Sequence, residues 1–320
     1  MDELSKRAMS LWPDLAGQMG MAPGAVQVAP LARRQDARVD MVALLLRDAS
    51  GRDLVLKLQD RPKDAEEFAE AMQGHMRSFE AFPEGVPELL AVDFDAQACV
   101  MEWVAGDPLA TVLQEAPVET HPGIMRQAGA WLGQFHRATL GEPRVFQPKY
   151  TMDYLRDVVD EVKSVKRDVA EKRKFLSCAE GFLARQPLYE GRRTQAAQTH
   201  GDLHMRNLLM GEQVKGIDFS AARVVPVGHD IARLLSDYAI LRARHDDIRP
   251  GEVVPVQVRD AFFDGYGVVR SDDPSVQLLL RHRVLAEWWG LPASESKRSV
   301  AQERRWQGIA SLVEKVFPEA

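Results

Sequence analysis

The feature that most constrains the fold of this 320-residue chain is a change of hydrophobic pattern near Gly106-Asp107-Pro108. Before this point, short apolar runs bounded by turn residues predict strands. After it, apolar residues recur at three- and four-residue spacing over long segments, which predicts helices. The chain contains no fixed-period repeat and no low-complexity tract. The pattern therefore predicts an α+β protein, with a small β-rich N-terminal lobe followed by a larger, mainly helical C-terminal lobe.

The first third of the sequence predicts a small sheet with one inserted helix. Residues 39–58 read as two strands joined by a tight turn at Asp48-Ala-Ser-Gly51, and Lys57 lies on the second strand. A helix with one apolar face is expected to begin at Pro62. Two further short strands are expected near residues 88–92 and 98–103.

The remainder predicts helices with one interruption. Apolar periodicity predicts helices over residues 123–139, 154–183, 231–244, 258–266 and 274–289. The interruption is a short hairpin, in which residues 208–210 and 214–218 flank the turn Gly211-Glu-Gln.

Composition and charge narrow the classes of partner. The formal net charge is −6 and the basic residues are scattered, which argues against a nucleic-acid backbone as the main partner. Two cysteines, Cys99 and Cys178, cannot form a disulfide framework, and Cys99 is expected in the core. No apolar run is long enough to span a bilayer and the first 20 residues lack a signal-peptide pattern, so a cytoplasmic protein without a membrane partner is expected. The oligomeric state stays open.

The strongest chemical signal is Thr199-His-Gly-Asp-Leu-His-Met-Arg-Asn207, followed eleven residues later by Asp218 in Gly-Ile-Asp-Phe. Phosphoryl transfer needs a carboxylate that orients the acceptor hydroxyl, and hard oxygen ligands for the divalent metal that holds the phosphates. Asp202 supplies such a carboxylate on a loop. Asn207 and Asp218 supply an amide and a carboxylate oxygen at the two ends of the predicted hairpin. Taken singly, each residue is equally consistent with a cap, a turn or a strand end; together they favour the phosphotransfer interpretation.

These residues resemble the signature of the aminoglycoside phosphotransferase and choline kinase superfamily, relatives of the protein kinases. The resemblance rests on His200-Gly-Asp-Leu-His-Met-Arg-Asn207, Ile217-Asp-Phe219 and His229-Asp230-Ile-Ala-Arg-Leu-Leu235. It extends to Val86-Pro-Glu-Leu-Leu-Ala-Val-Asp93 and Met101-Glu-Trp-Val-Ala-Gly106, and covers about residues 40–240. It implies a bilobal protein-kinase-like fold with a nucleotide-binding lobe at residues 1–100, a hinge at 101–106 and a catalytic and substrate-binding lobe at 107–320.

The resemblance also implies roles for individual residues and the cofactors ATP and Mg²⁺. Asp202 is expected to be the catalytic base or acceptor-orienting carboxylate, and Asn207 and Asp218 are expected to bind Mg²⁺. The backbone at Glu102 and Val104 is expected to hydrogen-bond adenine. Asp230 is expected to brace the catalytic loop, as is His200, while His204 is expected to face solvent.

Lys57 is expected to contact the α- and β-phosphates. Alternation along its strand also permits a lysine on the solvent face, and only the downstream motif favours the phosphate role. Its acidic partner on the following helix is not obvious, and Glu70 is the prediction.

One segment departs from the pattern of the family. The expected loop at residues 31–38 has no glycine to lie over the phosphates. Arg33, Arg34 or Arg38 could stand in, although a solvated run of charges is the simpler interpretation.

The acceptor is not fixed by the sequence. Glu287-Trp288-Trp289 suits a quaternary ammonium by cation–π contact, but a pair of core tryptophans is favoured. Arg281 and Arg283 argue equally for an anion. The predicted function is therefore an ATP-dependent small-molecule kinase that phosphorylates a hydroxyl of an amino alcohol, an aminoglycoside-like compound or a sugar. A regulatory pseudokinase and a protein kinase are the alternatives, although no Ala-Pro-Glu-like segment follows Asp218 to anchor a peptide.

Overall fold

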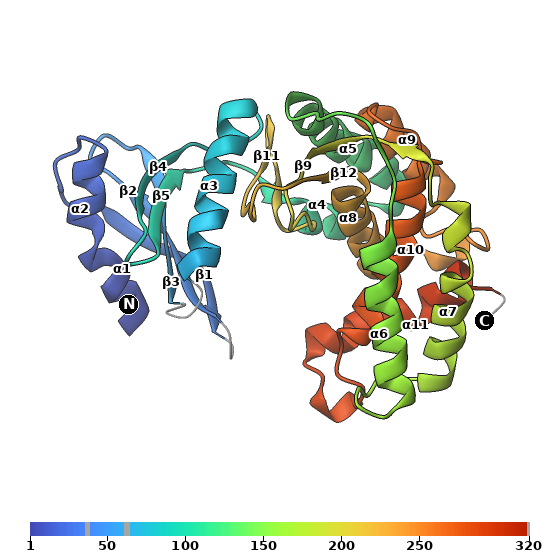
Figure 1. Ribbon diagram of the computed structural model, residues 1–320. Coiled ribbons are helices and arrows are strands. Elements are labelled where there is room, and N and C mark those ends of the chain that lie inside the picture. Colours follow the sequence, from blue (N-terminus) through green and yellow to red (C-terminus); the bar gives the residue numbers. More distant parts are fainter. Residues whose placement is uncertain (36–38, 61–64, 319–320) are drawn as a thin grey trace. The chain divides into compact units, whose positions relative to one another are not determined.

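The computed structural model describes residues 1–35, 39–60 and 65–318, and these divide into two compact units (Figure 1). One unit comprises Met1–Asp107 and Leu209–Ala222, and the other comprises Pro108–Leu208 and Arg223–Ala320. The predicted division at 1–100, 101–106 and 107–320 assigns each part a single continuous stretch of sequence. In the structure, the first unit also includes residues 209–222, which the prediction placed in the C-terminal lobe. A β-rich unit and a mainly helical unit together confirm the predicted α+β class.

A five-stranded antiparallel sheet forms the centre of the first unit, in the order β1-β2-β3-β5-β4. Its strands are β1 (Gln27–Gln35), β2 (Asp40–Arg47), β3 (Asp53–Asp60), β4 (Leu89–Asp93) and β5 (Ala98–Glu102). The predicted hairpin is confirmed by β2 and β3. Its turn is stabilised by Asp48, whose carboxylate accepts hydrogen bonds from the N–H groups of Ser50 and Arg52 at 2.8 and 2.9 Å.

Alternation along these strands produces a hydrophobic core on each face of the sheet. One face carries Leu44 and Leu56, which pack against helices α1 (Glu3–Ser10) and α2 (Trp12–Gln18). The other face carries Val55 and Cys99, which pack against α3 (Ala65–Ala81) through side chains that include Phe68. Successive side chains point to opposite faces of a strand. Lys57, two residues after Val55, therefore lies on the α3 face, and its side chain is only 14% exposed.

The start of the chain differs from the prediction. Residues 31–35, expected in a loop, belong to the edge strand β1, while residues 36–38 and the predicted helix start at Pro62 lie outside the described residues. Nor are the helices α1 and α2 anticipated by the sequence analysis. The Arg33 guanidinium is paired with Asp2 and Asp40 rather than lying free for phosphate. The misprediction has a physical reason: β1 is exposed along most of its length, so it lacks the apolar alternation that marks a strand.

The segment 209–222 is attached to the first unit by contacts along its length. The predicted hairpin is confirmed by β10 (Leu208–Met210) and β11 (Val214–Gly216), which pair with each other, and β10 pairs also with β6 (Asp107–Pro108). The Gly216 N–H donates to the Gly85 carbonyl at 2.8 Å, and the Lys215 ammonium lies 3.1 Å from the Glu102 carboxylate. These contacts place the residues that follow β11 beside α3 and β3.

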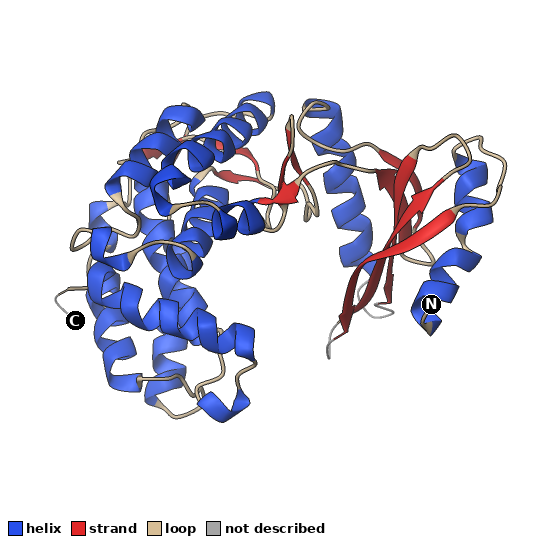
Figure 2. Cartoon of the chain, turned by 180° about the vertical axis from the view of Figure 1, so that it is seen from behind, coloured by secondary structure: helices blue, strands red, loops and turns tan. Residues whose placement is uncertain are grey.

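The second unit is built almost entirely from helices (Figure 2). They are α4 (Leu109–Glu115), α5 (His121–Ala138), α6 (Lys149–Lys163), α7 (Lys172–Leu183), α8 (Gly228–Leu241), α9 (Val256–Tyr266), α10 (Pro274–Trp289) and α11 (Val300–Val316). Helix α5 packs along α9, and α8 packs against α10 and α11. Short strands β7 (Arg144–Val145) and β8 (Arg193–Thr194) pair, as do β9 (Ala196–Gln198) and β12 (Val224–Pro226).

Four of the helices predicted in the second unit are confirmed, the one over 274–289 with the predicted ends and the other three with ends displaced by up to three residues, but the single helix predicted over 154–183 is wrong. It is broken into α6 and α7 by a turn in which Val165 and Glu171 have φ values of 62° and 49°. Residues other than glycine rarely adopt this left-handed backbone conformation. Because neither position is a glycine, the sequence gives no local signal of the break. Across the three described ranges, no helix has both the length and the apolar character needed to cross a lipid bilayer.

Candidate active site

The loop that carries Asp202 connects β9 to β10 and is folded by its own hydrogen bonds. At its start, the Thr199 N–H donates to the Arg223 carbonyl at 3.0 Å, and Gly201 adopts a φ of 82°, a conformation that glycine takes without strain. The Asp202 carbonyl then accepts from the His204 N–H at 2.9 Å and from the Asn207 side-chain amide at 3.0 Å. The loop is thus a compact turn, with Asp202 and Asn207 locked to each other.

Helix α8 holds this loop through one face. Asp230, in its first turn, accepts hydrogen bonds from the N–H groups of His200 at 2.7 Å and Gly201 at 3.1 Å. Two turns later, Asp237 accepts from the Met205 N–H at 3.1 Å. Side chains spaced by three and seven residues share one face of a helix, and Arg233 lies between these two acids. The bracing role expected for Asp230 is what the hydrogen bonds show.

Asp230 is fully enclosed and ionised. It also accepts from the Nε2 atom of His136, at 3.1 Å. Burial favours the neutral carboxyl, but the hydrogen bond and charge of His136, together with His200, outweigh it and lower the pKa of Asp230 below its usual value. The loop therefore rests on a buried carboxylate whose acceptor capacity is used by backbone and imidazole.

The Asp202 side chain projects from the loop and is 45% exposed. Its Oδ1 atom accepts from the Arg233 guanidinium at 2.7 Å, and its Oδ2 atom lies 3.7 Å from Nε2 of His204. His204 is half-buried rather than solvent-facing, which corrects the expectation for it. Burial lowers the pKa of His204 despite the opposing charge of Asp202, so the imidazole is neutral at neutral pH. The proposed base thus has one oxygen engaged by a cation and one that makes no hydrogen bond within the described residues.

Asn207 is buried, and its chemistry fits a metal ligand. Because its amide nitrogen donates to Asp202, its carbonyl oxygen points the other way and accepts no hydrogen bond within the described ranges. An amide oxygen is a hard donor of the kind that Mg²⁺ and Ca²⁺ prefer.

Lys57 and Asp218 form an ion pair within the first unit. Burial opposes the charged form of Lys57, but the Asp218 carboxylate outweighs it and raises the pKa of the lysine. Cys99 is opposite Lys57 in the β3–β5 register, and burial raises the pKa of its thiol to about 11. The cysteine is therefore an inert core residue, as predicted, and the solvent-facing alternative for Lys57 is excluded.

Asp218 has an unusual backbone conformation, with a φ of 63°. Among non-glycine residues, Asp and Asn tolerate this region best. The next residue, Phe219, is buried and packs edge-on against His75 of α3, with ring centroids 5.5 Å apart. His75 is itself fixed by the carbonyl of Pro87 at 2.7 Å. The turn after β11 is thereby pinned to α3 while the Asp218 carboxylate reaches Lys57.

The other predicted nucleotide-binding residues lie in the first unit with less definite geometry. Glu70 is exposed on α3, and the ion pair that Lys57 makes within the described residues is with Asp218. The N–H of Glu102 donates to the Glu88 carbonyl at 2.9 Å, whereas the N–H of Val104 makes no hydrogen bond in the described ranges. The assignments of Glu70, Glu102 and Val104 remain predictions.

The carboxy-terminal residues weighed as acceptor contacts are occupied within the second unit. Trp288 and Trp289 are 1% and 8% exposed, which supports the core interpretation. Arg281 donates to the Gly251 carbonyl at 2.7 Å, and Arg283 donates to Glu287 at 2.5 Å. The two tryptophans are therefore not exposed to bind an ammonium group, and the two arginines are already paired within the second unit.

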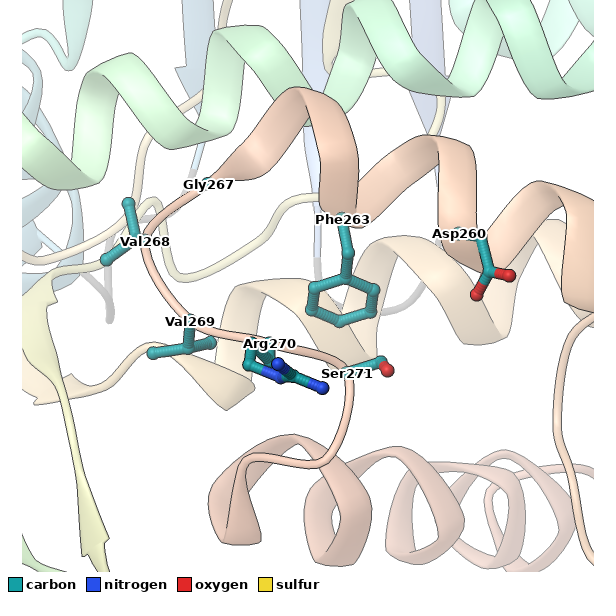
Figure 3. Close-up of a pocket in the computed structure, with 7 residues that line it drawn as sticks. All are labelled: Asp260, Phe263, Gly267, Val268, Val269, Arg270 and Ser271. Atoms are coloured by element: carbon teal, nitrogen blue, oxygen red, sulfur yellow. The ribbon is translucent and has the colours of Figure 1, made fainter.

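A pocket in the second unit lies away from these residues. It is formed by the end of α9 and the connection to α10, and Phe263 and Arg270 are among the residues that line it (Figure 3). Its lining contains none of the predicted site residues, and we assign it no role.

Comparison with known proteins identifies the class to which this architecture belongs. The structure resembles the macrolide 2'-phosphotransferase MphH of Brachybacterium faecium, with 17% identity, a TM-score of 0.59 and coverage of 95% of this chain and 97% of that one. It also resembles a putative fructosamine-3-kinase of Thermobifida fusca, with 20% identity, a TM-score of 0.55 and coverage of 94% and 99%. A third neighbour is the amicoumacin kinase hAmiN in complex with AMP-PNP, Ca²⁺ and Ami, with 13% identity, a TM-score of 0.56 and coverage of 98% and 94%. The fold is therefore the predicted bilobal α+β fold of the small-molecule kinases.

The sequence gives the more specific assignment. Residues 34–279 match the model of the phosphotransferase enzyme family, and the chain belongs to that family. No curated protein sequence matches it significantly. The expected relationship to aminoglycoside phosphotransferases and choline kinases is thus confirmed at the level of family and fold.

Proposed function

We propose that this protein is an ATP-dependent kinase that transfers the γ-phosphate to a hydroxyl group of a small molecule. The observation that carries the proposal is the geometry of Asp202. Its loop is fixed to α8 at both ends, one carboxylate oxygen is held by Arg233, and the other makes no hydrogen bond within the described residues. A general base must be held in place and still have an oxygen available for the proton that it accepts.

The residues present fit the cofactors that the family uses. Lys57 is a buried ammonium whose raised pKa keeps it charged, which suits contact with the α- and β-phosphates of ATP. Asn207 and Asp218 supply the amide and carboxylate oxygens that would hold a divalent cation, with Mg²⁺ as the proposed ion. When bound, the cation neutralises negative charge on the phosphates. An ATP analogue and Ca²⁺ accompany the amicoumacin kinase neighbour, which agrees with this donor set.

In the proposed reaction, Asp202 accepts a hydrogen bond from the acceptor hydroxyl through Oδ2 and takes its proton late. A bond forms between the acceptor oxygen and the γ-phosphorus, and the bond from that phosphorus to the β–γ bridging oxygen breaks, releasing ADP. The backbone at Glu102 and Val104 is proposed to bind adenine, and the N–H of Val104, which makes no hydrogen bond to any described residue, is consistent with this. Glu70 remains the proposed acidic partner of Lys57 once nucleotide displaces the contact with Asp218.

The acceptor class rests on the family resemblance. The neighbours reported above are named for a macrolide, a fructosamine and amicoumacin. These names do not choose among the acceptors expected from the sequence, so an amino alcohol, an aminoglycoside-like compound and a sugar are all kept as candidates.

Two substitutions test the assignment of roles. Asp202→Ala is expected to abolish turnover while leaving the affinity for Mg-ATP within about twofold of the parent, because Asp202 acts on the acceptor. Asp218→Ala is expected to weaken Mg-nucleotide binding instead, measured by calorimetry with and without Mg²⁺. Unchanged turnover in the first variant, or unchanged metal dependence in the second, would remove the corresponding role.

A further inference from the structure

Five charged side chains of the second unit form a series of contacts that begins at Asp202 and returns to the catalytic loop at a backbone N–H group. From Asp202 it passes to Arg233 of α8, Glu287 of α10, Arg305 of α11 and Asp237 of α8. Asp237 completes it by accepting from the Met205 N–H, three residues after Asp202. We call these five residues the ring.

The far side of the ring is tightly bound and largely buried. Arg305 donates to Glu287 through Nε at 2.7 Å and to Asp237 through both terminal nitrogens at 2.7 and 2.9 Å. The Asp237 and Glu287 side chains are 8% and 13% exposed. Although burial disfavours the charged guanidinium, the carboxylates of Glu287 and Asp237 raise the pKa of Arg305. This side of the ring is a fixed support.

Arg233 links that support to Asp202. Its Nη2 donates to Oδ1 of Asp202 at 2.7 Å, and its Nη1 makes an ionic contact of 3.6 Å with Oε1 of Glu287. That oxygen also accepts a hydrogen bond from Arg283 at 2.5 Å. The Nε atom of Arg233 is buried and has no partner among the described residues, so the terminal nitrogens alone orient the guanidinium. A planar guanidinium that has a hydrogen bond at one corner and an ionic contact at another restricts the direction of the carboxylate more than a flexible ammonium does.

Energetics favour an orienting role over a stabilising one. Ion pairs removed from water regain their desolvation cost only in part, so a partly buried network of this size contributes little net stability. It does restrict the geometry of the groups that it contains. In this ring the restricted group is the carboxylate on which the proposed chemistry depends.

We infer that Arg233 is a positioning residue: it holds Oδ1 of Asp202 so that Oδ2 faces the acceptor hydroxyl, and Glu287, which Arg305 fixes, supports Arg233. This inference rests on the proposed function. It assigns a role to a residue of α8 that neither the motif nor the family comparison singles out.

The test compares substitutions at Arg233 with a matched control. Arg233→Met is expected to lower kcat by ten- to a hundredfold while leaving KM for Mg-ATP within about twofold, because misplacement of a catalytic group affects the chemical step. Arg233→Lys keeps the charge without the planar fork and is expected to restore only part of kcat. Arg259→Met is the control, since Arg259 on α9 is similarly exposed and ion-paired, with Glu252 and Asp260, but has no link to the ring. ADP release from Mg-ATP is the readout, with the fastest acceptor of a panel of sugars, amino alcohols and antibiotics, or with water if no acceptor accelerates it.

A double-mutant cycle separates positioning from a general structural effect. If Arg233 acts through Asp202, Arg233→Met has no further effect on the residual turnover of Asp202→Asn. Glu287→Gln perturbs the ring without changing Arg233 or Asp202. In the ligand-free protein, this variant is expected to raise amide hydrogen exchange over residues 199–208. Multiplicative losses in the cycle, full activity of Arg233→Met, or kcat changes equal to those of Arg259→Met overturn the inference. Wild-type turnover in Asp202→Asn would instead contradict the proposed function itself, so the two failures are distinguishable.

Discussion

Gly74 of α3 offers a quantitative test of how the Asp218 turn is held. A Cβ atom at this position would lie 2.1 Å from the Ser220 carbonyl oxygen and 3.1 Å from the Ala222 nitrogen. Since Cβ contacts below 3.0 Å are essentially never seen, Gly74→Ala requires α3 and the backbone of residue 220 to separate by about 1 Å. Both are backbone elements, so no flexible side chain can absorb the change.

Two opposing contributions decide whether Gly74→Ala raises or lowers the free energy of unfolding. Replacing glycine by alanine inside a helix gains about 1 kcal/mol from helix propensity. Forcing an extra methyl group into a packed contact costs about 1–3 kcal/mol, and a contact with backbone is expected at the upper end of that range. The first unit should therefore lose about 1–2 kcal/mol of unfolding free energy. Because Phe219 and Asp218 directly precede the displaced residue, Mg-nucleotide affinity should fall as well.

The assay combines denaturant unfolding with titration of Mg-ATP. Gly181→Ala in α7 is the control, because a Cβ atom there meets nothing within 4 Å, so only the gain of up to about 1 kcal/mol applies. Opposite signs of stability change are expected for the two variants. The reasoning is refuted if Gly74→Ala is as stable as Gly181→Ala and binds Mg-ATP like the parent.

Three further predictions concern single ionisable groups. Lys57→Met removes the ion pair with Asp218 and the proposed phosphate contact, and should raise KM for ATP at least tenfold in steady-state assays. Asp230→Asn replaces one carboxylate oxygen by an NH₂ group, so one of the N–H groups of His200 and Gly201 would face a donor instead of an acceptor. The free energy of unfolding should fall by about 1–3 kcal/mol in thermal denaturation. Burial lowers the pKa of His282 to about 4, so between pH 6.5 and 4 the unfolded chain binds a proton that the folded chain does not. Stability should fall as the pH drops through this window by up to about 3 kcal/mol, and chemical denaturation of His282→Gln should show a smaller fall.

The sequence predicts best where chemistry and local pattern coincide. The hairpin between Asn207 and Asp218 is read from two short apolar runs and a glycine turn, and the structure contains it. Local rules suffice for this hairpin because turn residues and period-two alternation act within a few positions. The position of Lys57 is different, because alternation permits either face of the sheet and the packing of α3 decides which face is covered.

What could not be predicted depends on contacts between distant parts of the chain. Arg233 lies inside the segment 229–235 that resembles the family, but the resemblance gives it no role, and its pairing with Asp202, 31 residues earlier, follows from how α8 lies against the loop. The attachment of residues 209–222 to the first unit likewise depends on partners such as Gly85 and Glu102. The helix α1 did leave a local signal, since Asp2 caps it and Leu4 and Ala8 face the core one turn apart. That signal could have been used.

The central claim is tested most directly by acceptor-dependent release of ADP from Mg-ATP by the full chain. The panel comprises sugars, amino alcohols, aminoglycosides and macrolides, with mass spectrometry of the products and Asp202→Ala run in parallel. We expect at least one hydroxyl compound to accelerate ADP release and to gain one phosphoryl group, and we expect the effect to vanish in the variant. A tight Mg-ATP complex that releases no ADP with any member of the panel would contradict the claim and favour a regulatory nucleotide-binding protein.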